Sequence, residues 1–107
     1  MQWVVSGHSN GVILVHTYND DEPKQVERVE AHEGAVTSLA VHPSQPLVLS
    51  SSDDGTIRLW NWSEDWSCTR EFRRQKGTVL QVAFNPRDAS TFATVTTLPR
   101  TVKVFLP

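Results

Sequence analysis

The stretch that decides the fold runs from Ala31 to Asn61 and reads AHEGAVTSLAVHPSQPLVLSSSDDGTIRLWN. Parts of this stretch recur later in the chain: GAVTSLAVHP at residues 34–43 lies 43 positions before GTVLQVAFNP at residues 77–86. TIRL at residues 56–59 likewise corresponds to TVKV at residues 101–104. Chance rarely maintains such a register, so we treat the chain as an array of repeats.

Each repeat has the pattern of short β-strands. In the quoted stretch, apolar and polar residues alternate over residues 35–41, 47–51 and 56–60. His-Pro-Ser at residues 42–44 and Asp-Asp-Gly at residues 53–55 interrupt these runs and favour turns. A polar fourth strand is expected at residues 65–73. Four strands repeated about every forty residues predict an all-β fold built from β-propeller blades.

Only the middle repeat is complete. The chain of 107 residues is expected to form one domain, residues 1–107, with approximate units at 1–30, 31–73 and 74–107. The first unit lacks an innermost strand and the third an outer one, which leaves about two and a half to three blades. Closed propellers typically have about 4–8 blades. Either the chain is a piece of a longer protein, or copies associate head to tail to complete a ring.

Five polar or aromatic residues of the middle unit have a specific placement. His32 precedes the first strand, Ser50 and Ser52 lie on the second, Asp54 is in the turn and Trp60 ends the third. This arrangement resembles a WD40 repeat, although Ala and Asn stand where the family has the Gly of Gly-His and the Asp of Trp-Asp. The resemblance implies one buried hydrogen-bonded chain of His32, Asp54, Ser50 or Ser52, and Trp60. It is expected once, because Asn10, His16 and Gln75 replace its members in the other units.

The same residue types could form a Ser-His-Asp catalytic triad. No nucleophile elbow surrounds the serines, no oxyanion hole is indicated, and a triad leaves the tryptophan unexplained. We therefore expect no enzyme and no catalytic residues. The histidines His8, His16 and His42 lack the spacing of metal ligands, and no glycine-rich phosphate loop occurs, so neither metal nor cofactor is expected.

The composition and net charge argue against some classes of partner. A formal net charge of −2 argues against nucleic acid, and no long apolar run predicts membrane insertion. A single cysteine, Cys68, allows no internal disulfide. The expected location is intracellular.

Motifs spread along the chain are similar to the first propeller of the coatomer β′ family, at about its second to fourth blades. They include WVV at residues 3–5, LWNW at 59–62, WSC at 66–68 and RTVKV at 100–104. The resemblance implies a cytoplasmic scaffold of the COPI coat, peripheral to Golgi membranes or vesicles. Its partners would be coat subunits and the basic dilysine tails of cargo returning from Golgi to endoplasmic reticulum.

Three residues are candidates for contacting a partner. By the resemblance Asp53 matches an acidic position of the dilysine site, whereas Gly34 and Thr37 stand where acidic and basic residues are expected. Asp53 could equally be an ordinary turn residue. Trp62 and Trp66 form an aromatic pair that either caps a blade edge or binds a protein. The alternative function is a diverged interaction or self-assembly module, with homo-oligomers, that has lost the dilysine site.

Overall fold

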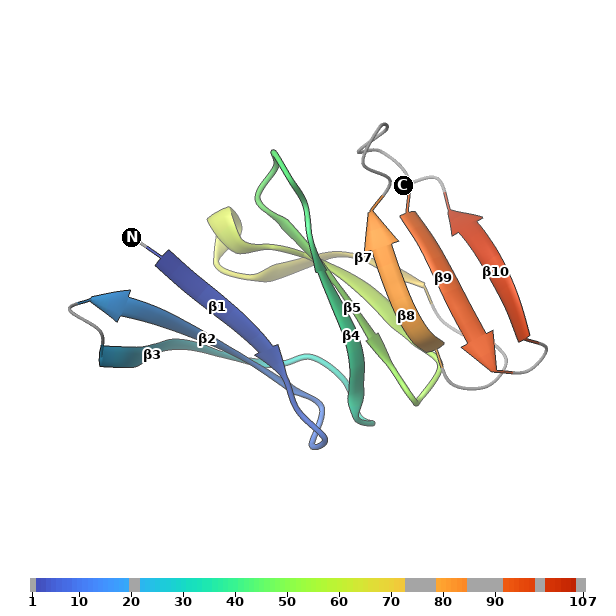
Figure 1. Cartoon of the computed structure of the whole chain (residues 1–107), viewed down its shortest axis with the longest axis horizontal. Coiled ribbons are helices and arrows are strands. Elements are labelled where there is room, and N and C mark those ends of the chain that lie inside the picture. Colours follow the sequence, from blue (N-terminus) through green and yellow to red (C-terminus); the bar gives the residue numbers. More distant parts are fainter. Residues whose placement is uncertain (1, 20–21, 73–78, 85–91, 98–99, 106–107) are drawn as a thin grey trace.

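The computed structural model describes residues 2–19, 22–72, 79–84, 92–97 and 100–105, with side chains at residues 3–17, 24–72, 79 and 81–84. The described residues form ten strands in three antiparallel sheets, which stand side by side in chain order (Figure 1). The first sheet contains β1 (Gln2–Gly7), β2 (Val12–Asn19) and β3 (Glu22–Glu30). The second contains β4 (Val36–Val41), β5 (Leu47–Ser52), β6 (Ile57–Asn61) and β7 (Ser67–Phe72). The third contains β8 (Val79–Phe84), β9 (Phe92–Thr97) and β10 (Arg100–Phe105).

The sheets are consecutive blades of an open, incomplete propeller. Three, four and three strands are the numbers expected from the sequence. β8 begins 43 residues after β4, which confirms the register of the repeat. Both strands carry a shift in register at their start, between Val36 and Ser38 and between Val79 and Gln81. The molecule measures 46 × 31 × 21 Å, as expected for an open stack.

Both faces of the middle sheet are covered. On one side Leu49, Ile57 and Leu59 pack against Val79 and Val82 of the third sheet. On the other, Ile13 and Val29 of the first sheet pack with Ala31 and Trp60, and Trp66 lies against this cluster. β5 is accordingly buried along nearly its whole length. Each buried Leu or Ile contributes about 1.5–3 kcal/mol by leaving water.

Backbone contacts join the first sheet to the second. The Gly11 carbonyl accepts hydrogen bonds from Ala31 N (3.1 Å) and His32 N (3.0 Å). A Cβ at position 11 would lie 2.0 Å from the His32 carbonyl oxygen, and its φ of +83° disfavours any other residue. Glycine is therefore required where the first blade meets the loop of the second.

The connection before the outer strand differs from the expected one. A strand over residues 65–73 was expected, but β7 covers Ser67–Phe72 and follows a 3₁₀ helix, η1 (Trp62–Glu64). Asp65 and Trp66 form a left-handed turn between them, with φ of 58° and 57°. Asn61 caps η1, because its side chain accepts a hydrogen bond from Ser63 N. Arg73 and Gln75 lie outside the described residues.

Candidate functional site

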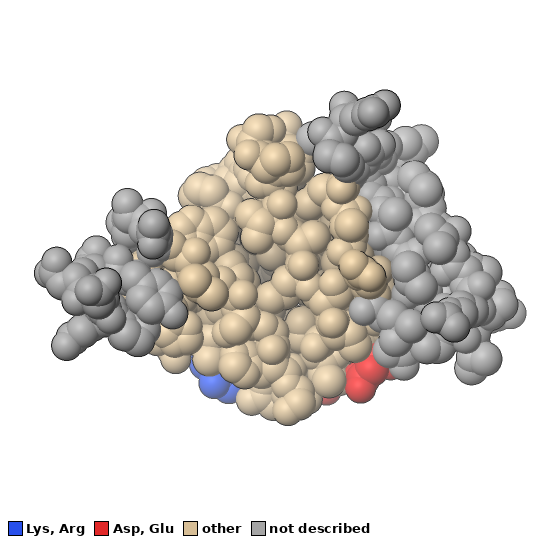
Figure 2. All heavy atoms as spheres, in the orientation of Figure 1, with Lys and Arg blue, Asp and Glu red and all other residues tan. Residues whose placement is uncertain are grey.

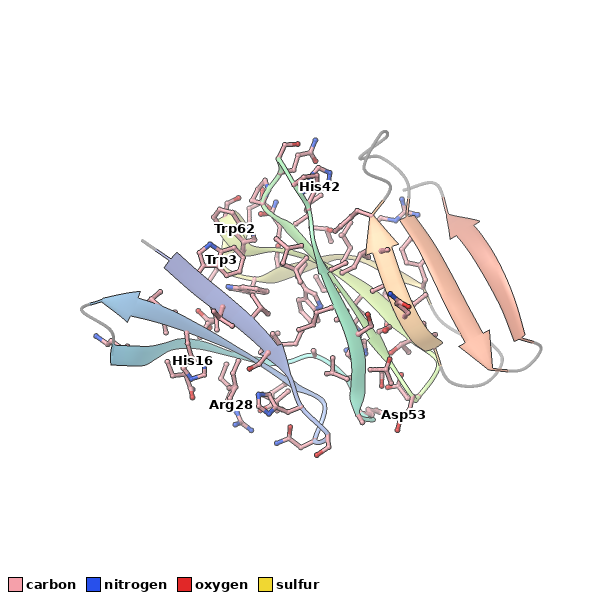
Figure 3. The ribbon with its side chains drawn as sticks, in the orientation of Figure 1. Trp3, His16, Arg28, His42, Asp53 and Trp62 are labelled. Carbon is pink, nitrogen blue, oxygen red and sulfur yellow. The ribbon has the colours of Figure 1, made fainter. Side chains whose placement is uncertain are left out.

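The middle blade has two dissimilar ends. One end, formed by residues 31–35 and 52–56, we call the polar end; the other, formed by residues 42–46 and 62–66, we call the tryptophan end. In Figure 3, Asp53 lies at the lower edge of the view, whereas Trp62, Trp3 and His42 lie toward the upper edge. The structure therefore separates Asp53 from Trp62 and Trp66, so these three do not form a single site.

A continuous chain of hydrogen bonds runs from the interior of the middle blade to the polar end. Trp60 Nε1 donates to Ser50 Oγ at 2.9 Å, and Ser50 Oγ lies 2.7 Å from His32 Nε2. His32 Nδ1 lies 2.7 Å from Thr56 Oγ1, whose hydroxyl donates to Asp54 Oδ1 at 2.5 Å. The links join strands β5 and β6 to the loop before β4. Ser50 rather than Ser52 makes the connection, while Ser52 Oγ accepts from Asp54 N at 3.2 Å.

Chemistry fixes the direction of the protons in this chain. A carboxylate only accepts, so Thr56 donates its one hydroxyl hydrogen to Asp54 and must accept from His32 Nδ1. In the neutral imidazole Nε2 then carries no hydrogen and accepts from the Ser50 hydroxyl. Burial lowers the pKa of His32 to about 4, although the charge of Asp54 acts to raise it. A neutral imidazole is therefore the form that this end holds.

Asp54 anchors the loop as well as the turn. Its Oδ2 accepts from the backbone amides of Glu33 (3.2 Å) and Gly34 (3.4 Å), and its Oδ1 accepts from Thr56 N (2.9 Å). Partial burial acts to raise the pKa of Asp54, but the hydrogen bonds, chiefly from Thr56, lower it to about 2. The carboxylate thus stays ionised and fixes the two loops to each other.

This geometry does not suit nucleophilic catalysis. The Ser50 side chain is fully buried and its oxygen already contacts both Trp60 and His32. A substrate carbonyl has no path to it. The polar residues at this end stabilise the blade and leave the neighbouring exposed carboxylates to face solvent.

Asp53 is exposed in the turn, and its backbone N donates to Ala35 O at 3.1 Å. No described residue donates a hydrogen bond to its carboxylate. A Cβ on Gly34 would lie 2.0 Å from Asp53 Oδ1, so a larger residue at position 34 would displace this carboxylate. Thr37 uses its hydroxyl to contact Ser51 Oγ (2.9 Å) and to donate to the Val79 carbonyl. Gly34 therefore leaves room for the Asp53 carboxylate, and Thr37 forms hydrogen bonds within the fold; neither position carries a charge.

The tryptophan end carries an apolar groove between the first and second blades. Its volume is about 230 Å³, and Trp3, Val15, Thr17, Trp62 and Trp66 line it. The rings of Trp3 and Trp62 are tilted by 59° with centroids 5.7 Å apart. Trp62 is 41 % exposed, but Trp66 is only partly exposed because it packs against the core. Of the two tryptophans, Trp62 is therefore the more exposed, whereas Trp66 both lines the groove and covers part of the core.

A second depression, of about 350 Å³, lies beside the first and shares Trp3 and Trp62 with it. The loop at residues 42–46 forms its far wall. His42 shapes this loop, because its buried Nδ1 accepts from Ser44 N (3.1 Å) and Gln45 N (2.9 Å). Trp62 N donates to Pro46 O at 3.0 Å and joins the loop to η1.

Sequence reasoning missed two of the residues that matter. Thr56 is an ordinary strand residue in the sequence, and only its place directly after the Asp-Asp-Gly turn could have shown that it bridges His32 and Asp54. Trp3 lies 59 positions from Trp62, and nothing local links them. Their contact requires the first two blades to stack.

The middle blade resembles a repeat of known proteins. The model of the family described as WD domain, G-beta repeat, matches residues 23–61. The chain therefore carries a WD40 repeat. That match spans β3 to β6 and contains the whole hydrogen-bonded chain from His32 to Trp60.

The similar proteins belong to several differently named groups. The chain is 33% identical over 94 residues to a p21-activated protein kinase-interacting protein 1-like protein of Gallus gallus, covering 88% of this chain and 24% of that protein. It is 48% identical over 46 residues to coatomer subunit beta'-2 of Oryza sativa subsp. japonica, covering 43% and 5%. It is 38% identical over 73 residues to human striatin, covering 64% and 9%. The chain thus spans between 5% and 24% of these relatives.

Among the described residues, no helix has the length and apolar character needed to cross a membrane.

Proposed function

We propose that this chain is a non-enzymatic protein-interaction scaffold whose stacked blades present two loop ends to partner proteins. One observation carries the proposal: the serine and histidine that could perform chemistry are buried and hydrogen-bonded to each other, and Thr56 separates the histidine from Asp54. The turn carboxylates and the tryptophan groove remain as exposed features of the described residues.

The finer proposal is a coatomer-like adaptor that binds a basic sorting tail at the polar end. Glu33 and Asp53 are both exposed there, and no described residue donates a hydrogen bond to either carboxylate. In Figure 2 the charged spheres of the described residues lie along the lower edge of the view, blue on one side and red on the other, near where Figure 3 labels Arg28 and Asp53. Two carboxylates suit the two ammonium groups of a dilysine tail. Such an adaptor would act in the cytoplasm, on Golgi membranes or COPI vesicles.

Two contacts favour a second candidate, a WD40 interaction or self-assembly module without a dilysine site. Asp53 Oδ1 occupies the space that an acidic side chain would need at position 34. The Thr37 hydroxyl is already hydrogen-bonded to two partners. A basic residue for the terminal carboxylate of a tail is then missing from position 37. In this candidate, copies of the chain or a fused partner meet the outer blades.

A peptide titration separates the two candidates. A peptide ending in a dilysine signal is titrated against the chain by calorimetry, with Asp53→Ala as the test variant. Glu64→Ala is the matched control, because it removes the same charge from an exposed residue at the tryptophan end. Saturable binding that Asp53→Ala abolishes and Glu64→Ala retains supports the adaptor.

Absence of binding at millimolar peptide excludes the adaptor. Light scattering coupled to size exclusion then tests the second candidate, for which a discrete oligomer is expected at every concentration. A chain that neither binds the peptide nor associates with itself or any protein would overturn the scaffold proposal itself.

A further inference from the structure

Among the described residues, the first sheet has no counterpart of the first strand of the other two sheets. β4 pairs with β5 in the second sheet, and β8 pairs with β9 in the third. β1 corresponds to β5 rather than to β4, because Trp3 pairs with Thr17 as Leu47 pairs with Asn61, 44 residues later. We call β4 and β8 the inner strands. No described strand takes the corresponding place beside β1, which is an edge strand with β2 as its neighbour.

The free edge of β1 presents backbone groups that can pair with another strand. His8 N donates to Val12 O at 3.0 Å, where the ladder between β1 and β2 starts. Hydrogen bonding alternates along an antiparallel strand. Ser6 therefore also bonds to β2, whereas Gly7 and Val5 direct their N–H and C=O groups to the other side. Such an edge is a template for a further strand.

At the next junction, two hydroxyl side chains of one inner strand hold the other. β4 and β8 lie side by side there (Figure 1). The Thr37 hydroxyl of β4 donates to the Val79 carbonyl, and Val82 N donates to Ser38 Oγ at 3.3 Å. Neighbouring Thr and Ser residues of one inner strand thus bond to the backbone of the inner strand that follows.

The junction between the first and second sheets has a depression at the equivalent place. In the 43-residue repeat, Val79 and Val82 correspond to Val36 and Leu39 of β4. These two residues of β4 line a depression of about 170 Å³, together with the residues between them and Gly7 at the end of β1. No described side chain of the first sheet donates to Val36 O or accepts from Leu39 N. The depression is therefore where the hydroxyl residues of a strand added to β1 would lie.

We propose that the edge of β1 binds an extended segment of a partner protein, which pairs antiparallel with β1 and lies against Val36 and Leu39. The inner strands of the chain show the pattern of such a segment. Residues 34–43, GAVTSLAVHP, and residues 77–86, GTVLQVAFNP, share Gly-x-Val-x-x-aliphatic-Ala-x-x-Pro. This inference rests on the scaffold function proposed above and names a kind of partner for it, at a place away from both loop ends.

A folded second copy of the chain cannot supply this segment. Its two segments with the pattern form β4 and β8, which are already paired with β5 and β9. Val79 and Val82 of β8 are also buried in the core cluster between the second and third sheets. The segment therefore comes from another protein that keeps it extended and unpaired, as in recognition by strand addition.

Two positions of the segment decide its affinity. A threonine and a serine at the places of Thr37 and Ser38 can donate to Val36 O and accept from Leu39 N, as the same residue types do one junction later. Apolar residues at these places leave both backbone groups without these partners. A segment with the two hydroxyls should therefore bind more tightly than one without them.

The test is a calorimetric titration of the whole chain with synthetic peptides. The first peptide has the sequence of residues 34–43, GAVTSLAVHP. The reference peptide differs only in having valine for the threonine and alanine for the serine. Saturable binding of the first peptide is expected, about tenfold tighter than binding of the reference peptide, because two hydrogen bonds are lost in the latter.

Methylation of single peptide amides tests the strand pairing without altering the protein. In the chain itself His42 N donates to Leu47 O at 2.9 Å, so by alternation Ala40 bonds to β5 and Leu39 does not. An N-methyl group on the peptide residue that corresponds to Ala40 should weaken binding by at least about tenfold. An N-methyl group on the residue that corresponds to Leu39 is the matched control and should leave most of the affinity.

Amide hydrogen exchange, followed by NMR, locates the bound peptide. Binding should slow the exchange of the Val5 and Gly7 amides, which face the free edge. The Ser6 amide already bonds to β2, and the Thr69 amide lies on β7 at the other edge of the second sheet, so both should change little.

Three outcomes would overturn the proposal. In the first, the peptide does not bind, or it binds no better than the reference peptide. In the second, both methylated peptides lose the same affinity, or binding leaves the exchange of Val5 and Gly7 unchanged. In the third, light scattering shows a dimer in which these two amides exchange slowly without peptide, which would assign the edge to a second copy. A chain that binds partners at its loop ends but not this peptide would refute the strand addition alone and leave the scaffold function intact.

Discussion

The two ends of the middle blade differ in whether their hydrogen-bond donors have acceptors. At the polar end, each donor from Trp60 to Thr56 is matched by an acceptor, and the sequence of bonds ends on an ionised Asp54. At the tryptophan end, three indole donors have no acceptor among the described residues, and the rings line open depressions.

This difference separates stability from recognition within one blade. A buried donor without an acceptor costs about 1–3 kcal/mol of stability. The hydrogen bonds between the buried polar groups of this chain avoid that cost. The tryptophan end has open depressions, where water can meet exposed polar groups. Mutations of equal chemistry at the two ends should therefore have unequal effects.

The largest difference is expected between two tryptophans that are two residues apart. Trp60→Ala should lower the free energy of unfolding by about 3–5 kcal/mol, because it empties a buried site and removes the donor to Ser50. Trp62→Ala should lower it by less than about 1 kcal/mol, since the ring is 41 % exposed. Urea unfolding followed by circular dichroism measures both. Equal losses would mean that the groove belongs to the core.

A pair of serines gives a smaller contrast. Ser50→Ala leaves the Trp60 N–H and His32 Nε2 without their partner and should cost about 1–3 kcal/mol. Ser63→Ala removes only an exposed bond to Asn61 Oδ1, at 2.7 Å, and should change the stability by less than about 0.5 kcal/mol. The same urea experiment compares them. A Ser50→Ala protein as stable as the parent would show that the chain of hydrogen bonds adds little.

The polar end also predicts a pH dependence. The pKa of His32 is about 4 in the folded chain, below its ordinary 6.5, so between these values the unfolded state binds more protons. Stability should therefore fall as the pH falls from about 6.5 to about 4. Asp54, with its pKa lowered to about 2 from 3.8, should add a further loss below pH 4.

Variants assign that pH dependence to a residue. His32→Gln should flatten the decline between pH 6.5 and 4, whereas His16→Gln, outside the hydrogen-bonded chain, should retain it. Thermal unfolding at half-unit pH steps provides the comparison. A decline that survives in His32→Gln at full size would place its origin in another group.

The sequence predicts the two ends unequally well. Strand alternation, the Asp-Gly turn and the 43-residue register depend on neighbouring residues, and these features predicted the blades and the register between β4 and β8. The positions of His32, Ser50, Asp54 and Trp60 could be proposed from their order in one repeat, but the bridging role of Thr56 depends on side-chain direction.

The tryptophan end was harder to predict, because it depends on contacts between blades. Trp3 reaches Trp62 only when the first sheet stacks on the second, and no local pattern encodes that distance. The left-handed turn at Asp65 and Trp66 was also missed, because these residue types are not the glycines that usually mark positive φ. A buried ring overrides that local preference.

The smallest expected effect tests this left-handed turn. Asp65 and Trp66 have nearly the same φ, but Asp65 is exposed, whereas Trp66 packs against the core cluster. Asp65→Gly should therefore raise the free energy of unfolding by about 0.5–1 kcal/mol by relieving the strain. Trp66→Gly relieves the same strain but loses the ring contacts, so its net effect should be destabilising. If both variants were stabilised, the Trp66 ring would contribute less than the backbone strain that accompanies it, and the groove would lack a fixed wall.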